Sequence, residues 1–182
     1  MLISSKITTA IEMCCELHKN QTRKATTVPF ASHPISVGFI LLSSGYMEEI
    51  IIAGILHDVL EDTTGTEKDI ENIFGKHVVS LIKGVTENIS IKSWEDKKNS
   101  YLKNLKNAEN DIKAISAADA LDNCRSMIRV LKNGINIWDA FTVSREKIIE
   151  NYKQRVSIIK ETLQDAITTE LESVIIELEK FI

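Results

Sequence analysis

Apolar side chains recur three and four positions apart over most of this chain, and that spacing limits the folds it can adopt. In an α-helix the spacing places side chains on one face, so each such stretch predicts a helix with a buried side. Only two prolines and seven glycines interrupt the pattern, and alternating runs typical of strands are almost absent. The sequence therefore predicts an all-α helical bundle.

Caps and breaks divide the pattern into separate helices. Ser4 or Ser5 can cap a first helix that runs to about His18, and Pro34 suits the first turn of a second helix, which Gly45 closes. A nearly all-apolar helix should follow over about 47–60. Further helices are expected over 66–74, through the segment HVVSLIKGV, and over 94–106, 110–132, 138–163 and 165–182.

The size and evenness of the chain predict one domain. A length of 182 residues with 43% hydrophobic residues is enough for a core that stands alone. No internal repeat, low-complexity tract or linker suggests a second unit. We expect residues 1–182 to form a single domain, with the last helices packing on the rest.

Charge and composition exclude several classes of partner. A net charge of −4 disfavours a broad surface for nucleic acid or acidic membranes. The chain has no secretion leader at its amino terminus and no long uncharged apolar run, so we expect a cytoplasmic protein without a membrane span. The three cysteines, Cys14, Cys15 and Cys124, are expected to be reduced, buried residues.

The stretch LHDVLEDT, residues 56–63, places one histidine and three carboxylates beside an apolar run. In a helix His57 and Glu61 share a face, with Asp58 and Asp62 one step round. The ordinary interpretation of these residues is that the carboxylates are charges at a helix end and the histidine belongs to the core. However, leaving these groups uncompensated beside IIIAGIL would cost on the order of several kcal/mol each, and a divalent cation would compensate them. Adjacent ligands can aim at one ion from a helix end, so the helix should finish here.

Two further ligand candidates lie elsewhere in the chain. His33 is fixed by Pro34 at the start of the second helix, and Asp119 lies among small apolar residues in a later helix. Alone, each has an ordinary reading, as a capping or core histidine and as a helix-surface charge. Together with His57 and Asp58 they form a two-histidine, two-aspartate set that suits manganese, iron or another octahedral ion.

Five motifs in a fixed order carry a family resemblance: HKNQTRK, PFASHPISV, LHDVLEDT, FGKHVVSLIKGVT and ADALDN. They resemble the HD phosphohydrolase superfamily, and within it the hydrolase domain of RelA/SpoT alarmone enzymes and their stand-alone metazoan-type relatives. The resemblance implies a helical HD-domain bundle and a manganese-dependent reaction. That reaction removes the 3′-pyrophosphate of guanosine tetraphosphate or pentaphosphate, giving GDP or GTP and pyrophosphate. A small nucleotide is the implied partner, and the oligomeric state is left open.

The resemblance also implies roles for the acidic residues. His33, His57, Asp58 and Asp119 match the metal ligands of the family. Glu61 would orient or deprotonate the attacking water, and Asp62 would support it. The alternative for Glu61 is a solvated carboxylate at a helix end.

Other positions match substrate contacts of the family. Arg23 could stack on a purine and Lys24 could contact phosphate, although both could instead neutralise the end of the first helix. Asn123 and Ser126 match ribose and phosphate contacts. Lys147 and Tyr152 lie near the positions of a phosphate-contacting base and an aromatic residue. His18 and Gln21 are expected to shape the loop after the first helix.

Three positions depart from the family pattern. Ala120 and Asp122 stand where a basic residue and an aromatic or histidine are usual, and Ala25 replaces a serine or acidic residue. If Asp122 faced the cavity it would repel a polyphosphate, and if it faced outward it would be trivial. Two alternatives therefore stay open: hydrolysis of another phosphorylated nucleotide, such as the 2′-phosphate of NADPH, and a non-catalytic nucleotide-binding module.

Overall fold

The computed structural model describes residues 3–182, and the regular structure in that range is helical. The helices are α1 (Ser5–Leu17), α2 (Ser32–Ser43), α3 (Glu48–Leu56), α4 (Val59–Asp62), α5 (Glu67–Phe74), α6 (Lys76–Val85), α7 (Trp94–Lys106), α8 (Asn110–Lys132), η1 (Ile137–Ala140), α9 (Arg145–Lys160), α10 (Ala166–Leu178) and η2 (Glu179–Phe181). One isolated bridge joins Thr22 and Pro29 in the loop after α1. The prediction of an all-α fold is confirmed.

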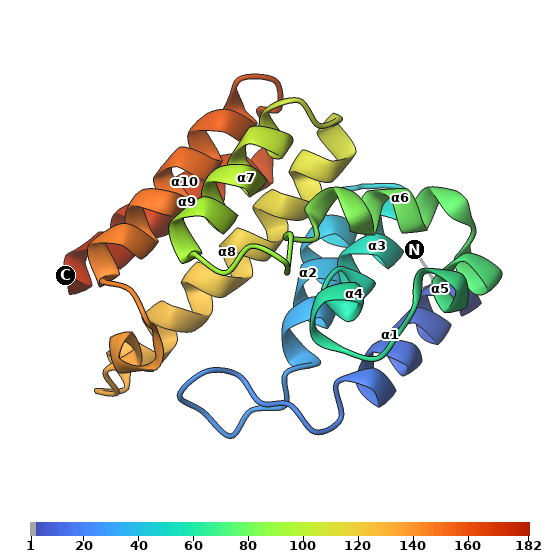
Figure 1. Cartoon of the computed structure of the whole chain (residues 1–182), viewed down its shortest axis with the longest axis horizontal. Helices are drawn as coiled ribbons and strands as arrows, with labels where there is room; N and C mark the ends of the chain where they lie inside the picture. Colours follow the sequence, from blue (N-terminus) through green and yellow to red (C-terminus); the bar gives the residue numbers. More distant parts are fainter. Residues whose placement is uncertain (1–2) are drawn as a thin grey trace.

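The long helix α8 runs between two groups of helices (Figure 1). Helices α1 to α6 lie on one side of it, and α9 and α10 lie on the other, with α7 packed against α9. Buried apolar side chains from α1, α2, α3, α8 and α10 belong to one contiguous core. Residues on the middle of α8 therefore face both groups of helices.

Two glycines let α2 and α3 pack backbone against backbone. A Cβ atom built on Gly38 would lie 2.3 Å from Ile55 Cγ1, and one built on Gly54 would lie 3.8 Å from the Cα atom of Gly38. The close crossing brings the start of α2 beside the end of α3. The rings of His33 and His57 consequently lie with their centroids 5.2 Å apart.

Several expected caps are present. Ser4 accepts a hydrogen bond from the backbone N–H of Ile7, and Thr66 and Asp69 form a capping box at the start of α5. Gly45 adopts a positive φ of 81° after α2. The expected helix end at the HD pair is confirmed as well, because α3 stops at Leu56 and α4 begins at Val59.

The helix expected over 138–163 was wrong at its start. Residues Ile137–Ala140 form the 3-10 turn η1, Phe141 is extended, and α9 begins only at Arg145. Ser144 caps α9 by accepting a hydrogen bond from the backbone N–H of Lys147. The Ser144 side chain bonds to a backbone N–H of the first turn, so the helix begins after this residue and does not extend back through it.

The expectation of buried cysteines holds for two of three residues. Cys14 and Cys124 are buried and free, whereas Cys15 is exposed. Burial raises the pKa of the Cys14 thiol to about 12, so this group is a packing residue at neutral pH.

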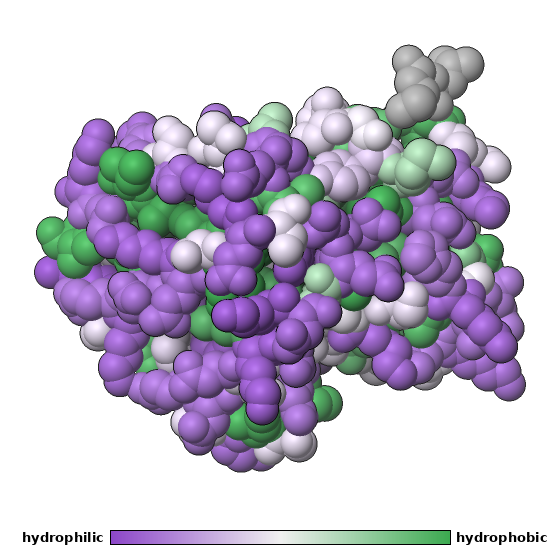
Figure 2. Space-filling model, turned by 90° about the horizontal axis from the view of Figure 1, so that it is seen from above, coloured by the Kyte–Doolittle hydropathy of each residue, from purple (hydrophilic) through white to green (hydrophobic). Residues whose placement is uncertain are grey.

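One face of the molecule is mainly hydrophilic (Figure 2). Figure 2 shows one face on which hydrophilic residues predominate and hydrophobic residues form small separated patches. Within residues 3–182, no helix combines the length and the apolar character needed to cross a bilayer.

Candidate active site

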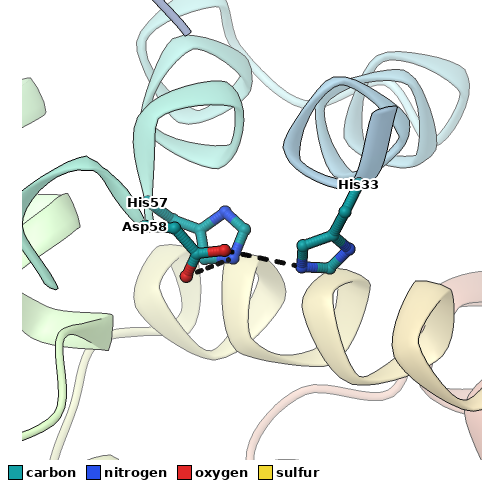
Figure 3. Close-up of side chains that lie close together, drawn as sticks. All are labelled: His33, His57 and Asp58. Carbon is teal, nitrogen blue, oxygen red and sulfur yellow. Dashed lines mark ion pairs between the residues drawn. The ribbon is translucent and has the colours of Figure 1, made fainter. Parts of the chain in front are cut away.

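Residues from separate elements meet at the crossing of α2 and α3. His33 lies in the first turn of α2, while His57 and Asp58 occupy the break between α3 and α4. Figure 3 shows both imidazoles turned toward the Asp58 carboxylate. His33 Nε2 lies 3.7 Å from Asp58 Oδ2, and His57 Nε2 lies 3.2 Å from Asp58 Oδ1.

Asp119 completes the group from the middle of α8. Its Oδ1 atom lies 3.1 Å from His33 Nε2 and 3.7 Å from His57 Nε2. The structure thus brings together the four side chains that the sequence pattern singled out. Among them, His33, His57 and Asp58 each offer one ligand atom within 4.8 Å of the others.

The hydrogen bonds of the two imidazoles suit a metal ion. His57 Nδ1 lies 2.8 Å from the Gly54 carbonyl oxygen, and His33 Nδ1 lies 2.7 Å from Asp122 Oδ2. Because both partners accept hydrogen bonds, each Nδ1 carries a proton, and in the neutral imidazole each Nε2 is left with a lone pair directed at the cluster. Within residues 3–182 the buried His57 Nε2 has no hydrogen-bond partner of acceptable geometry, although the Asp58 and Asp119 carboxylates lie 3.2 and 3.7 Å away. This donor set fits a divalent metal ion.

Electrostatics at the centre favour a cation. Burial alone would lower the pKa of His57, but Asp58 and Asp119 outweigh it and raise that pKa to about 9. The pKa of His33 is also raised against the effect of burial, by hydrogen bonds to Asp119 and Asp122. Without a metal ion, the carboxylates would draw protons onto the imidazoles. A divalent cation would supply the same positive charge.

Asp119 is held by two further side chains. Arg155 Nη2 donates to Asp119 Oδ2 at 2.7 Å, and Asn123 Nδ2 donates to Asp119 Oδ1 at 2.6 Å. Burial would raise the pKa of Asp119, but the Arg155 guanidinium and the imidazoles of His33 and His57 keep it well below its usual range. Asp119 is therefore an ionised carboxylate with a fixed orientation.

Asp122 neither faces the cavity nor points into solvent. Only 9% of the residue is exposed. Besides the bond to His33, its Oδ2 atom lies 3.6 Å from Arg23 Nη2. The negative charge that departs from the family pattern is therefore paired, and it supports a metal-ligand candidate.

Glu61 and Asp62 lie on α4 and line a cavity beside the cluster. Glu61 Oε2 accepts a hydrogen bond from the backbone N–H of Glu87 at 3.0 Å. Burial raises the pKa of Glu61 to about 7, although that hydrogen bond opposes it. Gln21 Nε2 donates to the Asp62 carbonyl at 2.7 Å, which ties the loop after α1 to α4.

The cavity has a volume of about 550 Å³ and includes most of the predicted substrate residues. Those in its lining are Arg23, Lys24, Asn123, Ser126 and Tyr152. Lys147 is outside it: this side chain is exposed and pairs with Glu95. The face of α9 that lines the cavity carries Ile148, Asn151, Tyr152 and Arg155. The structure therefore places Tyr152 in the cavity, as expected, and Lys147 outside it.

Sequence reasoning also missed several groups that line the cavity. Lys98 on α7 enters it and pairs with Glu87, with its Nζ 2.5 Å from Oε1. Phe141 lies under Lys24, whose Nζ is 4.2 Å from the ring centroid. The sequence around Lys98 is typical of a charged surface helix. Nothing in it indicates that Lys98 lines a cavity.

The fold and the His, His–Asp and Asp cluster define the class of HD-domain proteins. The chain belongs to this family, since residues 10–143 match the family model described as an HD domain. A zebrafish relative named guanosine-3′,5′-bis(diphosphate) 3′-pyrophosphohydrolase MESH1 is 29% identical over 162 residues, covering 85% of this chain and 88% of its own. The Drosophila melanogaster protein of the same name is 30% identical, covering 82% and 86%.

A solved structure agrees with these relatives. It is described as a metazoan orthologue of SpoT that hydrolyses ppGpp, and it superposes with a TM-score of 0.84 at 27% identity, covering 97% of both chains. These relatives confirm the resemblance to the SpoT type of HD-domain hydrolase that the motifs indicated. The prediction that the chain is a hydrolase is confirmed with it.

Proposed function

We propose that this chain hydrolyses the 3′-pyrophosphate of guanosine 3′,5′-bis(diphosphate), or of its pentaphosphate form, to give GDP or GTP and pyrophosphate. One observation carries the proposal: four metal-ligand candidates converge at a cavity that also holds an acid of pKa about 7, Glu61. The names of the similar hydrolases support the choice of nucleotide.

The metal proposed is Mn²⁺, held by His33, His57, Asp58 and Asp119. When bound, such an ion supplies positive charge that stabilises the charge developing on the phosphoryl oxygens. Two nitrogens with two carboxylates, and space left for further ligands, suit an octahedral ion of this kind.

The residues around the cluster account for the rest of the reaction. Hydrolysis forms a bond from a water oxygen to the phosphorus next to the ribose. It breaks the bond from that phosphorus to the 3′-oxygen, which leaves with the bonding electron pair and takes up a proton to become the ribose 3′-hydroxyl. Glu61 lies beside the cluster and accepts the proton of the attacking water. Its hydrogen bond from Glu87 fixes the carboxylate in place, and Asp62 adds negative charge that favours proton uptake.

Basic and aromatic groups in the cavity bind the nucleotide in this proposal. Arg23, Lys24 and Lys98 offer positive charge to two diphosphate groups. Tyr152 and Phe141 offer faces for the base and ribose. Because Asp122 is paired with His33 and Arg23, its charge does not oppose a polyphosphate.

Product analysis tests the proposal. Incubation of the chain with guanosine 3′,5′-bis(diphosphate) and Mn²⁺ should release GDP and pyrophosphate in equal amounts, and a chelator should stop release. Asp58→Ala should abolish turnover, while Glu12→Ala, an exposed carboxylate on α1, should not change it. No turnover with any divalent cation would overturn the proposal. A higher kcat/KM for the release of inorganic phosphate from NADPH would assign the site to another nucleotide.

A further inference from the structure

Arg155 places a buried guanidinium beside the metal-ligand cluster. It reaches from α9 toward α8, and only 8% of the residue is exposed. Its Nε donates to Ser116 Oγ at 2.7 Å, and its Nη2 lies 2.7 Å from the Ser116 carbonyl oxygen and 3.1 Å from the Tyr101 hydroxyl. The remaining partner of Nη2 is Asp119 Oδ2, at 2.7 Å.

In this arrangement the two carboxylate oxygens of Asp119 contact different groups. Oδ2 is occupied by Arg155, whereas Oδ1 faces the Nε2 atoms of His33 and His57. Rotation of the carboxylate would break the bond to Arg155. The guanidinium therefore keeps one Asp119 oxygen turned toward the ligand cluster.

On α8 itself, no positively charged side chain lies next to Asp119. Ala120 follows Asp119 and is fully buried, so the neighbouring position carries no charge. Asn123, the other partner of Asp119, is neutral. Arg155 is thus the guanidinium that pairs with Asp119 Oδ2, whereas the imidazoles of His33 and His57 face Asp119 Oδ1.

We propose that Arg155 is a positioning residue for the metal centre, which orients Asp119 as a ligand through a single oxygen. The proposal rests on the metal-ligand set of the proposed function. It makes α9, which supplies no ligand itself, necessary for a well-formed metal site. Nothing in the proposal requires Arg155 to touch the nucleotide.

Direct titration with Mn²⁺ tests this role without any turnover. The EPR signal of free Mn²⁺ disappears as the ion binds, so it reports the dissociation constant. Arg155→Met should weaken binding about 10- to 100-fold. Arg155→Lys keeps a charge but not the planar fork, and should bind severalfold more weakly than the wild type.

Ser116→Ala is the matched control, because it removes a hydrogen bond of Arg155 but leaves the pair with Asp119 in place. Its Mn²⁺ affinity should stay within about twofold of wild type, even if its Tm falls. Wild-type affinity in Arg155→Met, or equal losses in Ser116→Ala and Arg155→Met, would overturn the positioning role. If Arg155→Met does not fold, wild-type affinity in Arg155→Lys overturns it instead.

The same titration separates the two proposals. A wild-type chain that binds no Mn²⁺ would overturn the metal site and the role of Arg155 together. A wild-type chain that binds Mn²⁺, with unchanged affinity in the Arg155 variants, overturns only the role of Arg155.

Discussion

Glu61 carries the proton transfer in the proposed reaction, and its surroundings predict how activity depends on pH. Burial raises the pKa of Glu61 to about 7, and only the ionised carboxylate can accept a proton. With saturating Mn²⁺, kcat/KM should therefore rise about tenfold per pH unit below the pKa of Glu61 and level off above it, and the charge of the bound ion should place that pKa below 7. Glu61→Gln should lower the plateau about 10²- to 10⁴-fold and remove this acidic limb. An unchanged limb in Glu61→Gln would assign the proton transfer to another group.

Asp122 gives a second prediction, because its carboxylate accepts a hydrogen bond from His33 Nδ1, the ring nitrogen that faces away from the metal-ligand cluster. Asp122→Asn keeps the size of the side chain and can still accept the hydrogen bond, but it loses the charge. Mn²⁺ affinity should fall about tenfold, as is typical when a partner of a metal-binding histidine is changed. Titration of free Mn²⁺ measures the change. Unchanged affinity would mean that Asp122 only neutralises Arg23.

Functional residues that lie together in a sequence motif could be predicted from the sequence. Those brought to the site by tertiary packing could not. His57, Asp58, Glu61 and Asp62 stand together in the chain, so their chemistry was visible. Arg155 reaches the site from a helix whose sequence reads as amphipathic and charged. Which of its faces meets the cavity depends on how α9 packs on α8, and the position of Lys147 outside the cavity depends on it as well.

The element that fixes the two imidazoles is the crossing of α2 and α3. Gly38 meets Ile55 so closely that an added methyl group would overlap it. Gly38→Ala should separate the helices, lowering the free energy of unfolding by about 1–3 kcal/mol and moving His33 away from His57. Denaturant unfolding and Mn²⁺ titration should show both losses. Ser43→Ala, exposed at the end of the same helix, should show neither, and a Gly38→Ala variant with intact Mn²⁺ affinity would contradict this account.

Helix boundaries were predictable where a local signal set them. The break at the HD pair followed from the need to aim adjacent ligands at one ion, and the capping box at Thr66 followed from its residue types. The segment before Arg145 carried helical spacing but is not α-helical. There Trp138 and Phe141 pack on each other, with ring centroids 6.3 Å apart, and Phe141 also lies beneath Lys24. The contact of Phe141 with Lys24 is tertiary, so local periodicity could not reveal it, and the Ser144 cap sets where α9 begins.

In the whole molecule, the metal-ligand candidates connect α8 to the helices on one side of it, and Arg155 connects the cluster to the other side. The all-α class was predictable because helical spacing is local. The crossing of α8 between the two groups was not, since it depends on contacts far apart in sequence. That the chain forms a single domain stays a prediction.

Mn²⁺ should therefore stabilise the whole fold. At a free concentration 100 times its dissociation constant, an ion that binds only the folded state adds about 2.7 kcal/mol. For a chain of this length that corresponds to a Tm about 5–10 °C above the value in chelator. Differential scanning fluorimetry measures the shift, and Asp58→Ala should show none. A shift that persists in Asp58→Ala would place the ion elsewhere.

We expect four side chains, from α2, the α3–α4 break and α8, to hold one divalent ion. Anomalous scattering from a crystal grown with Mn²⁺ would locate this ion. We expect a single strong peak in contact with His33 Nε2, His57 Nε2, one Asp58 oxygen and Asp119 Oδ1, with Asp119 Oδ2 still bound to Arg155. A map with no peak there, or a peak that Asp119 does not contact, would contradict the account.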